Sequence, residues 1–286
     1  MEQIADEIKN ALENIKEKKP LTQCITNVVT VNDCANAVLA VGASPIMADD
    51  AEEVEEIVEI ADTLVVNIGK LSETQIEAMN VACKYASKTK TPITIDPVGC
   101  GISNLRNKTT MDIINNYYVS VIRGNMSEIK AIGNLLEIKS DNSEKAKGVD
   151  ANESDIITKE NLKTNSLIVE KVSKKTNAVV IASGPIDIIS DGEKTIAIEN
   201  GDSMMERITG SGCMLSSIVG SFIGSSDTFN GSIAATLIMS IAGENAKKYV
   251  DEHNLGTGTF RSKLIDNLYK LDSEEIIEKG NIYTIE

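Results

Sequence analysis

Six short apolar runs recur along this chain, and most are followed by a polar residue or a glycine and then by apolar residues at helical spacing. The runs are LTQCIT, SPIMA, TLVVNIG, PITIDPVG, VSVIRG and AVVIAS. Strands that alternate with helices in this way build a mainly parallel sheet with helices on both faces. The sequence therefore predicts an α/β fold in three layers.

The remaining patterns add helices at both ends and an antiparallel hairpin. Apolar residues at helical spacing precede Pro20, which closes a first helix. The runs DIISDG and KTIAIEN, with Asp191-Gly192 as a turn signal, predict an antiparallel hairpin at the edge of the sheet. Two further helices are expected, from Cys213 to about Ile223 and from Gly231 to about Val250, and the second should be buried on most of its circumference.

The chain is expected to form one domain, residues 1–286. The segment from Leu135 to Ser154 is polar, charged and aperiodic, which makes it the best candidate for a linker. The pattern of strands and helices resumes after it, and neither half would hold a complete sheet. We therefore interpret the segment as a surface excursion within that domain.

The charge balance argues against polyanionic partners. Lys and Arg total 28 against 43 Asp and Glu, a net charge of -15, which repels nucleic acids and anionic lipid surfaces. Aromatic residues make up 3% of the chain and Trp is absent, so platforms for stacking bases are scarce. No uncharged apolar stretch reaches the roughly 18 residues that a membrane-spanning helix needs. Neither nucleic acid nor a membrane is expected as a partner.

Cysteine and histidine usage excludes several chemistries. The five cysteines include no CxxC pair, which is typical of a reduced, cytoplasmic protein without a structural zinc site. The single histidine, His253, lies among polar residues near the C-terminus and is interpreted as a surface residue. Ser-His-Asp, Cys-His and multi-histidine metal sites therefore lack their key component.

The stretch ERITGSGCMLSSIVG places Ser211 between Gly210 and Gly212, directly before an apolar helical run. The glycines let the backbone bend closely, and the N–H groups and dipole of the following helix then point at whatever lies in front. Such a turn can act as an anion hole for a phosphoryl group in transfer, whose charge needs positioning and electrostatic stabilisation. The alternative is that the turn only packs the start of the helix.

Two strand ends carry residues suited to phosphate and metal. In ITIDPVGCG the apolar alternation ends at Asp96, at the carboxyl end of a strand, where open α/β sheets bind ligands. In VIRGNMSEI a strand ends at Arg123, and Asn125 and Glu128 stand three residues apart at the start of a helix. These side chains could hold a hydrated Mg²⁺ while Arg123 meets phosphate. The alternatives are a turn residue before Pro97 and a helix capping box.

The segment QCITNVVTVNDCANAVLAVGASPIM combines small amides with a thioether. Asn27, Asn32 and Asn36 accompany an apolar helix that ends at Gly42, and Met47 follows the next short strand. Small polar groups beside a thioether could cradle a compact heteroaromatic ligand. The alternative for Met47 is core filling.

Taken in order, these segments resemble the hydroxyethylthiazole kinase family, whose members are ribokinase-like enzymes. The matching motifs are ITNxVxxNxxAN, SPIMA, IDPVGxG, RGNxSEI, GVDA, ASGxxDxISDG and GSGC before a small-residue helix. They run from Pro20 to about Gly243, and their combination is specific although no single motif is. The resemblance implies a ribokinase-like fold and transfer of the ATP γ-phosphate to the hydroxyl of 4-methyl-5-(2-hydroxyethyl)thiazole for thiamine salvage. It also implies a homotrimer with the thiazole pocket at subunit boundaries.

The resemblance assigns ligand roles to individual residues. Met47 and Gly210 fall at substrate-binding positions, and we add Asn27 from the amide-rich segment described above. Arg123 and Ser183 fall at positions that bind ATP.

The resemblance further implies a metal site and a catalytic position. Asp96 and Glu128 fall at positions around Mg²⁺, and Cys213 stands where many ribokinase-like enzymes have a catalytic aspartate. A thiol at a helix N-terminus can have a lowered pKa, while phosphates push that pKa upward, so the sequence leaves the ionisation of Cys213 open. The loose transition state of phosphoryl transfer asks little of a base. We expect Cys213 to assist deprotonation only modestly, with the anion hole and Mg²⁺ carrying most of the rate.

Two alternative functions remain at this stage. A hydroxymethylpyrimidine kinase of the same fold would need the same anion and metal residues, although Met47 and the ITN segment favour thiazole. A nucleotide-binding regulatory protein without catalysis is the second alternative. The joint presence of Asp96, Arg123, Glu128 and the glycine turn argues against it, because a scaffold has no physical need for all of them.

Overall fold

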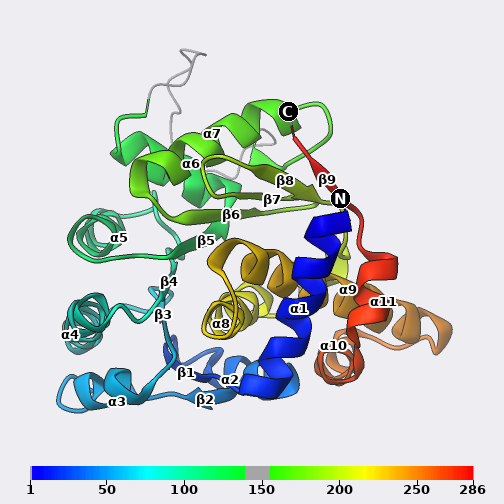
Figure 1. Ribbon diagram of the computed structural model, residues 1–286, viewed down its shortest axis with the longest axis horizontal. Coiled ribbons are helices and arrows are strands. Elements are labelled where there is room, and N and C mark those ends of the chain that lie inside the picture. The colour runs from blue at the N-terminus through cyan, green and yellow to red at the C-terminus, as the bar shows by residue number, and fades with distance from the viewer. Residues whose placement is uncertain (1, 139–154, 286) are drawn as a thin grey trace.

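Each of the six apolar runs forms a strand of one sheet in the computed structural model, which describes residues 2–138 and 155–285 (Figure 1). The strands of that sheet are β1 (Leu21–Ile25), β2 (Ser44–Ile46), β3 (Thr63–Asn67), β4 (Ile93–Asp96), β5 (Val121–Asn125), β6 (Val179–Ser183), β7 (Asp187–Ser190), β8 (Thr195–Ile198) and β9 (Ile282–Thr284).

The strands lie in the order β2-β1-β3-β4-β5-β6-β7-β8-β9. The pairs from β2 to β6 are parallel, and those from β6 to β9 are antiparallel. The predicted hairpin is therefore confirmed as β7 and β8, and its turn contains Gly192 in the left-handed region, at φ +90°. The short C-terminal strand β9, which the sequence did not reveal, pairs outside the hairpin and forms the edge.

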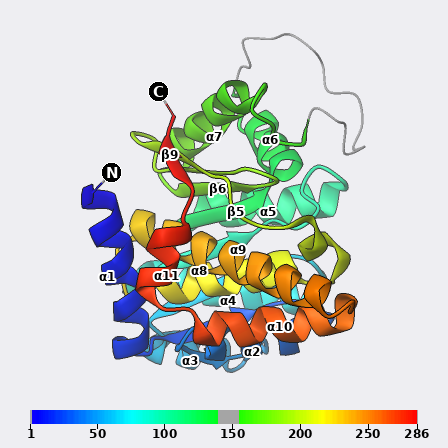
Figure 2. The ribbon, with the colours of Figure 1, turned by 90° about the vertical axis from the view of Figure 1, so that its right-hand side faces the viewer.

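Helices cover both faces of this sheet, as predicted (Figures 1 and 2). One face carries α3 (Val54–Ile60), α4 (Glu73–Thr89), α5 (Asn104–Asn116), α6 (Met126–Leu135) and α7 (Leu162–Thr176). The other face carries α1 (Glu2–Lys18), α2 (Val31–Ala40), α8 (Ser211–Ile223), α9 (Thr228–Glu252), α10 (Thr257–Lys270) and α11 (Ser273–Lys279), and a short 3-10 helix spans Ser203–Arg207 before α8.

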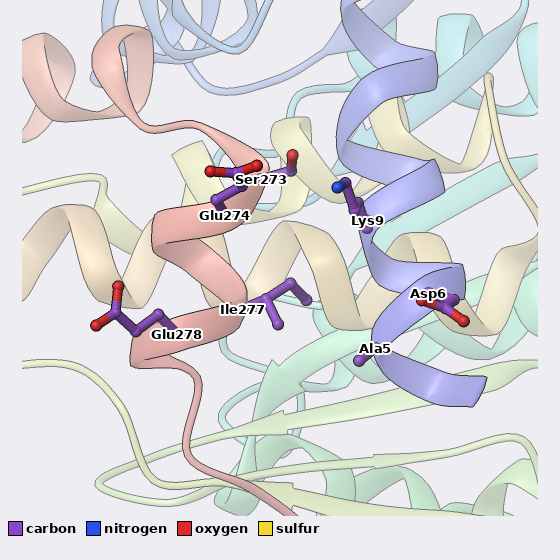
Figure 3. Close-up of a pocket in the computed structure, with 7 residues that line it drawn as sticks. All are labelled: Ala5, Asp6, Lys9, Ser273, Glu274, Ile277 and Glu278. Carbon is purple, nitrogen blue, oxygen red and sulfur yellow. The ribbon is translucent and has the colours of Figure 1, made fainter. Parts of the chain in front are cut away.

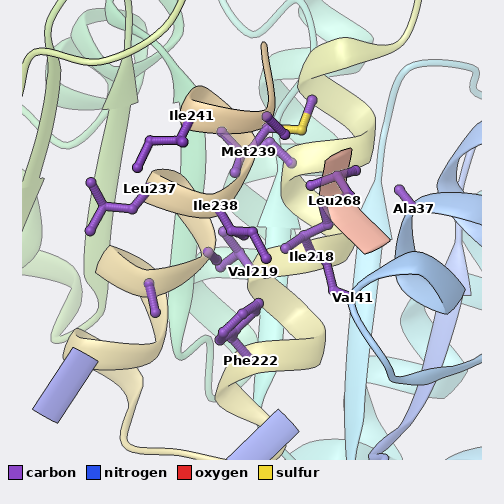
Figure 4. Close-up of a cluster of buried hydrophobic side chains, with 14 of the residues drawn as sticks. Ala37, Val41, Ile218, Val219, Phe222, Leu237, Ile238, Met239, Ile241 and Leu268 are labelled. Atoms are coloured by element: carbon purple, nitrogen blue, oxygen red, sulfur yellow. The ribbon is translucent and has the colours of Figure 1, made fainter. Parts of the chain in front are cut away.

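Two apolar cores lie on either side of the sheet because neighbouring strand residues point to opposite faces. On β5, Val121 joins one core and Ile122 the other. Figure 4 shows part of the first core, where Phe222 and Ile218 of α8 pack against Ile238 of α9. No helix within residues 2–138 and 155–285 has the length and apolar character needed to cross a membrane.

Small residues bring α8 unusually close to the sheet. A Cβ on Gly220 would lie 2.2 Å from Cγ2 of Val65 in β3. The Ser221 hydroxyl lies 2.9 Å from that of Thr22, near the beginning of β1, whereas Ser216 bonds Asp96 at the end of β4. The helix therefore runs antiparallel to these strands, and its N-terminus lies at their carboxyl ends.

The helix boundaries differ from the sequence-based expectation at two places. The helix α8 begins at Ser211 rather than at Cys213, because Gly210 takes up the left-handed conformation, at φ +87°, immediately before it. The helix α9 begins at Thr228 rather than Gly231, because Asp227 caps its first N–H groups. Most of the predicted excursion from Leu135 to Ser154, and the GVDA motif, lie outside the described residues.

Candidate functional site

The carboxyl ends of the parallel strands bring polar residues from distant parts of the chain to one edge of the sheet. Since β2, β1, β3, β4, β5 and β6 are neighbours in that order, the side chains that follow them also form a row. At roughly 4.8 Å per strand, the row spans about 24 Å. In strand order, its members are Met47, Asn27, Asn67, Asp96, Glu128 and Ser183.

Cys213 lies above the middle of this row, in the first turn of α8. Its Sγ accepts hydrogen bonds from Nδ2 of Asn27 at 3.4 Å and from Nδ2 of Asn67 at 3.3 Å. Burial, together with the charge of Asp96, raises the pKa of the thiol, and hydrogen bonds from neighbouring side chains only partly oppose that shift. Cys213 is therefore a protonated thiol at neutral pH.

Asp96 contacts residues of three other elements of the site. Its Oδ2 accepts hydrogen bonds from Nδ2 of Asn67 and Oγ of Ser216, both at 2.7 Å, and lies 4.0 Å from Nη1 of Arg123. Burial raises the pKa of Asp96 to about 7; Arg123 opposes this shift, and the charge of Glu128 adds to it. Asp96 thus lies between Cys213, with which it shares the Asn67 amide as hydrogen-bond donor, and the guanidinium of Arg123.

The raised pKa of Asp96 has a measurable consequence for metal- and nucleotide-free protein. Between about pH 4 and about pH 7 the folded state holds a proton that the unfolded chain has lost, so the free energy of unfolding falls as the pH rises. We expect the difference between wild type and Asp96→Asn to fall by up to about 1.4 kcal/mol per pH unit in this window and to level off above it. Urea denaturation of both proteins across the window measures the difference. A difference that does not change with pH would contradict the assignment.

Arg123 and Ser183, the two predicted nucleotide ligands, are in contact. Nε of Arg123 donates to Oγ of Ser183 at 3.2 Å. The guanidinium is buried behind the glycine turn, since a Cβ on Gly212 would lie 2.7 Å from Arg123 Nη1. The neighbouring Asp187 is also buried, and burial raises its pKa to about 6. Arg123 therefore supplies positive charge directly beneath the turn.

The turn at Gly210 presents free backbone donors. The helix α8 has no side-chain cap, and within residues 2–138 and 155–285 no acceptor bonds the amides of Ser211, Gly212 and Cys213. These residues are only half-buried. A Cβ on Gly210 would lie 2.6 Å from Cγ2 of Thr30, so glycine is required by space as well as by its φ of +87°. Free amides at a helix N-terminus beside a buried guanidinium suit a bound phosphoryl group.

Glu128 is held by backbone rather than left free. The capping box considered as an alternative is present: Asn125 Oδ1 accepts from Glu128 N, and Glu128 Oε2 accepts from Asn125 N at 2.8 Å. Its Oε1 accepts from Gly99 N at 2.7 Å. These bonds leave lone pairs on both oxygens, so the capping role and a role near a cation are compatible.

The donor set fits a magnesium ion that is held mainly by phosphate and water. Within the described part of the chain, no group of three or more His, Cys, Asp or Glu side chains is arranged to hold a metal ion. Mg²⁺ keeps several waters and typically uses one or two carboxylates together with substrate phosphates. Asp96 and Glu128 offer two carboxylates close enough for one to raise the pKa of the other.

The predicted substrate side is assembled only in part. Met47 follows β2 and is half-buried, at the end of the row beyond Asn27. Asn27 is buried and also bonds Asn67 Oδ1 at 3.2 Å. Asn32 and Asn36 bond each other on an exposed part of α2 rather than joining Asn27.

Sequence reasoning missed Asn67 and Ser216. Asn67 bonds Asn27, Asp96 and Cys213 and so connects three predicted residues. The signal for it was present, because Asn67 is the polar residue that ends the apolar run TLVVN. Ser216 had no such signal, since its contact with Asp96 depends on how α8 crosses β4.

A surface hollow elsewhere on the molecule is lined by residues of two helices rather than by strand ends. It measures about 300 Å³ and lies between α1 and α11, with Lys9, Glu274 and Ile277 among its lining residues (Figure 3). It shares no residue with the row of strand ends. The strand-end site is therefore the candidate active site.

The chain is similar to known proteins over nearly its whole length. The hydroxyethylthiazole kinase family model matches residues 12–274 of the chain. The chain is 59% identical over 281 residues to a hydroxyethylthiazole kinase of Methanobrevibacter smithii, covering 98% of each sequence. A hydroxyethylthiazole kinase structure from Pyrococcus horikoshii OT3 matches with a TM-score of 0.83 and 32% identity, covering 98% of this chain and 99% of that one. A ribokinase-like superfamily protein from Enterococcus faecalis shares the fold alone, with a TM-score of 0.58, 14% identity and coverage of 93% and 95%.

Proposed function

The chain belongs to the hydroxyethylthiazole kinase family, and on that premise we propose that it transfers the γ-phosphate of ATP to the hydroxyl of 4-methyl-5-(2-hydroxyethyl)thiazole. The product is the thiazole phosphate used in thiamine salvage. One observation supports phosphoryl transfer as the chemistry of this site. The amides of Ser211, Gly212 and Cys213, which no acceptor bonds in the described part of the chain, lie beside the buried Arg123 and Asp96, at the edge where strand ends converge.

The row of strand ends supports a division between two ligands. We assign ATP to the side of β5 and β6, where Arg123 and Ser183 are bonded to each other. We assign the thiazole alcohol to the side of β2 and β1, where Met47 and Asn27 lie and where Gly210 packs against Thr30. The acceptor hydroxyl and the γ-phosphate then meet near Cys213 and the glycine turn, in the middle of the row.

Positioning and electrostatic stabilisation account for most of the proposed catalysis. The transferring group carries negative charge on its oxygens, and the turn amides with Arg123 are already oriented toward it before reaction begins. Asp96 and Glu128 would hold Mg²⁺, which when bound neutralises charge on the phosphates. Asn67 keeps Cys213 and Asp96 in fixed relation, because the same Nδ2 donates to both.

Cys213 is expected to contribute little as a base. Its thiol keeps its proton at neutral pH, since burial and Asp96 raise its pKa. We expect Cys213→Ala to lower kcat about tenfold, well short of the loss of up to about 10⁴-fold that follows removal of a true general base. Steady-state turnover and calorimetric binding of the thiazole alcohol measure the two effects separately. Complete loss of turnover with intact binding would overturn the modest role.

A kinase assay with purified protein tests the function itself. We expect ADP release that depends on the added thiazole alcohol. Hydroxymethylpyrimidine serves as the matched acceptor, and preferential phosphorylation of it would replace the proposed substrate by that of a related kinase. Tight ATP binding without turnover of either alcohol would instead indicate a regulatory nucleotide-binding protein.

We further propose a single-domain, cytoplasmic homotrimer with the thiazole pocket at subunit boundaries. Val28 and Val29 support this assembly, because both side chains are mostly exposed, at 64% and 68%, directly beside Asn27. Burial of such apolar side chains by a neighbouring subunit would be favourable and would close the site. All five cysteines are free thiols, which suits the reducing cytoplasm. Sedimentation of the purified protein tests the trimer.

A further inference from the structure

Arg106, in the first turn of α5, bonds two loops of the site at once. Its Nη1 donates to the carbonyl oxygen of Ile68 at 2.7 Å and to that of Val98 at 2.5 Å, and its Nη2 donates to that of Gly69 at 3.0 Å. Ile68 and Gly69 follow β3, whereas Val98 follows β4. The half-buried guanidinium therefore clamps the backbones that leave two neighbouring strands.

The loop after β3 holds Asn67 in place. The amide of Gly69 donates to Asn67 Oδ1 at 2.8 Å, and the amide of Ile68 donates to the carbonyl oxygen of Asp96 at 3.1 Å. The carbonyl groups of the same two residues, Ile68 and Gly69, accept from Arg106. The orientation of the Asn67 amide, and with it the contact to Cys213, thus depends on backbone that Arg106 fixes.

The loop after β4 carries the acidic side of the site. Val98 lies two residues after Asp96, and Gly99 donates its amide to Glu128. Gly99 has a φ of +74°, and a Cβ there would lie 3.1 Å from Cδ of Arg106. Because Gly99 has no side chain, the aliphatic part of the Arg106 side chain can lie beside it.

Arginine suits this position because its planar fork can reach acceptors on two loops, whereas the ammonium of lysine is a compact point charge. The helix start is itself anchored, since Ser103 Oγ accepts from Arg106 N at 3.3 Å. The cation close to Asp96 is Arg123, at 4.0 Å. Arg106 is therefore placed to act through backbone geometry rather than through its charge.

We propose that Arg106 is a positioning residue for phosphoryl transfer, which holds the loops after β3 and β4 so that Asn67 and Asp96 keep their places around Cys213. The role rests on the proposed kinase function. A displacement of about 1 Å at a reacting centre can cost about 10²-fold in rate. We expect Arg106→Ala to lower kcat by about that factor, and Arg106→Lys to recover only part of the loss.

The effect should fall on kcat rather than on nucleotide binding. The KM for ATP is expected to change less than about threefold, because the assigned ATP ligands Arg123 and Ser183 lie on other strands. Asn107→Ala is the matched control. Asn107 Oδ1 accepts from Gly101 N at 2.6 Å, so it anchors the loop after β4 from the same helical turn, and within residues 2–138 and 155–285 it makes no hydrogen bond to the loop after β3.

Hydrogen exchange gives a readout that does not require activity. In the ligand-free protein, we expect the amides of Ile68 and Gly69 to exchange about tenfold faster in Arg106→Ala than in wild type, and at the wild-type rate in Asn107→Ala. If Arg106→Ala does not fold, Arg106→Lys carries the same comparison. Wild-type kcat, or wild-type exchange at both amides, in a folded Arg106 variant overturns the proposal. Failure of the wild-type protein to phosphorylate the thiazole alcohol rejects the kinase function, while the exchange experiment still tests the clamp.

Discussion

Asp96→Asn is expected to lower kcat about 10³-fold while leaving the protein folded. The amide oxygen of asparagine can keep the hydrogen bonds that Asn67 and Ser216 make to Asp96 Oδ2. In an assay above the Asp96 pKa of about 7, where the carboxylate is ionised, the substitution therefore removes mainly the negative charge, 4.0 Å from Arg123, that we assign to the cation site. The KM for the thiazole alcohol should change little, because Met47 and Asn27 lie on the far side of the row. Initial rates at saturating ATP measure both parameters.

Ser216→Ala is the matched control for this experiment. It deletes one hydrogen bond to the same carboxylate oxygen and leaves the charge. We expect its kcat to stay within about tenfold of wild type, in line with the modest value of a single hydrogen bond. If Asp96→Asn retains a tenth or more of the activity, or if Ser216→Ala is equally impaired, charge at Asp96 is not what catalysis needs.

Gly220→Ala is expected to destabilise the protein by about 1 to 3 kcal/mol, although alanine favours a helix. The new methyl group would lie 2.2 Å from Cγ2 of Val65, a buried, β-branched side chain on β3. Because Val65 is buried and its β-branched side chain is stiff, we expect α8 to move away from the sheet to relieve this overlap. Since the first turn of α8 carries the glycine turn and Cys213, we expect kcat to fall as well. Urea denaturation and initial rates measure the two effects.

Val65→Ala provides the internal check. Val65→Ala by itself should lower the free energy of unfolding. The double variant should nevertheless lose less than the sum of the two single losses, because the methyl group at position 220 fills the space that the Val65 side chain leaves. Gly258→Ala is the control at a helical glycine with open surroundings, where a Cβ would meet nothing within 4 Å. It is expected to stabilise the protein slightly, by at most about 1 kcal/mol. Additive losses at Gly220 and Val65 would contradict the close contact.

The strands and the turn that the sequence predicted are those whose residue pattern lies within a few neighbouring positions. The six apolar runs and the hairpin turn at Asp191-Gly192 correspond to strands, because alternation and turn residues act over a few neighbouring positions. The strand β9 escaped prediction, since a three-residue strand at a sheet edge is defined by its partner β8 rather than by its own residues. The ligand and catalytic roles assigned to the strand-end residues, to the glycine turn and to Cys213 all stay predictions.

The residues of the site likewise divide into those that the sequence indicated and those that it did not. Asp96 and Arg123 were predicted because each ends an apolar run, and Gly210 and Gly212 because they precede a helix. Arg106 had no such signal, since its partners Ile68 and Val98 are 38 and 8 residues away along the chain. The ionisation of Asp96 could not be predicted from the sequence either. The pKa of Asp96 rises to about 7 mainly through burial, which exists only after packing.

By itself, the sequence determined the α/β class, the order of strands and helices along the chain, and the residue types that stand at each strand end. The tertiary structure alone decided that β3 lies between β1 and β4, which puts Asn67 between Asn27 and Asp96. It also decided that α8 crosses those strands closely enough for Cys213 and Ser216 to reach them. The reason is physical: periodicity and turn residues are properties of neighbours in the chain, whereas strand order and helix crossing depend on burial shared by segments far apart.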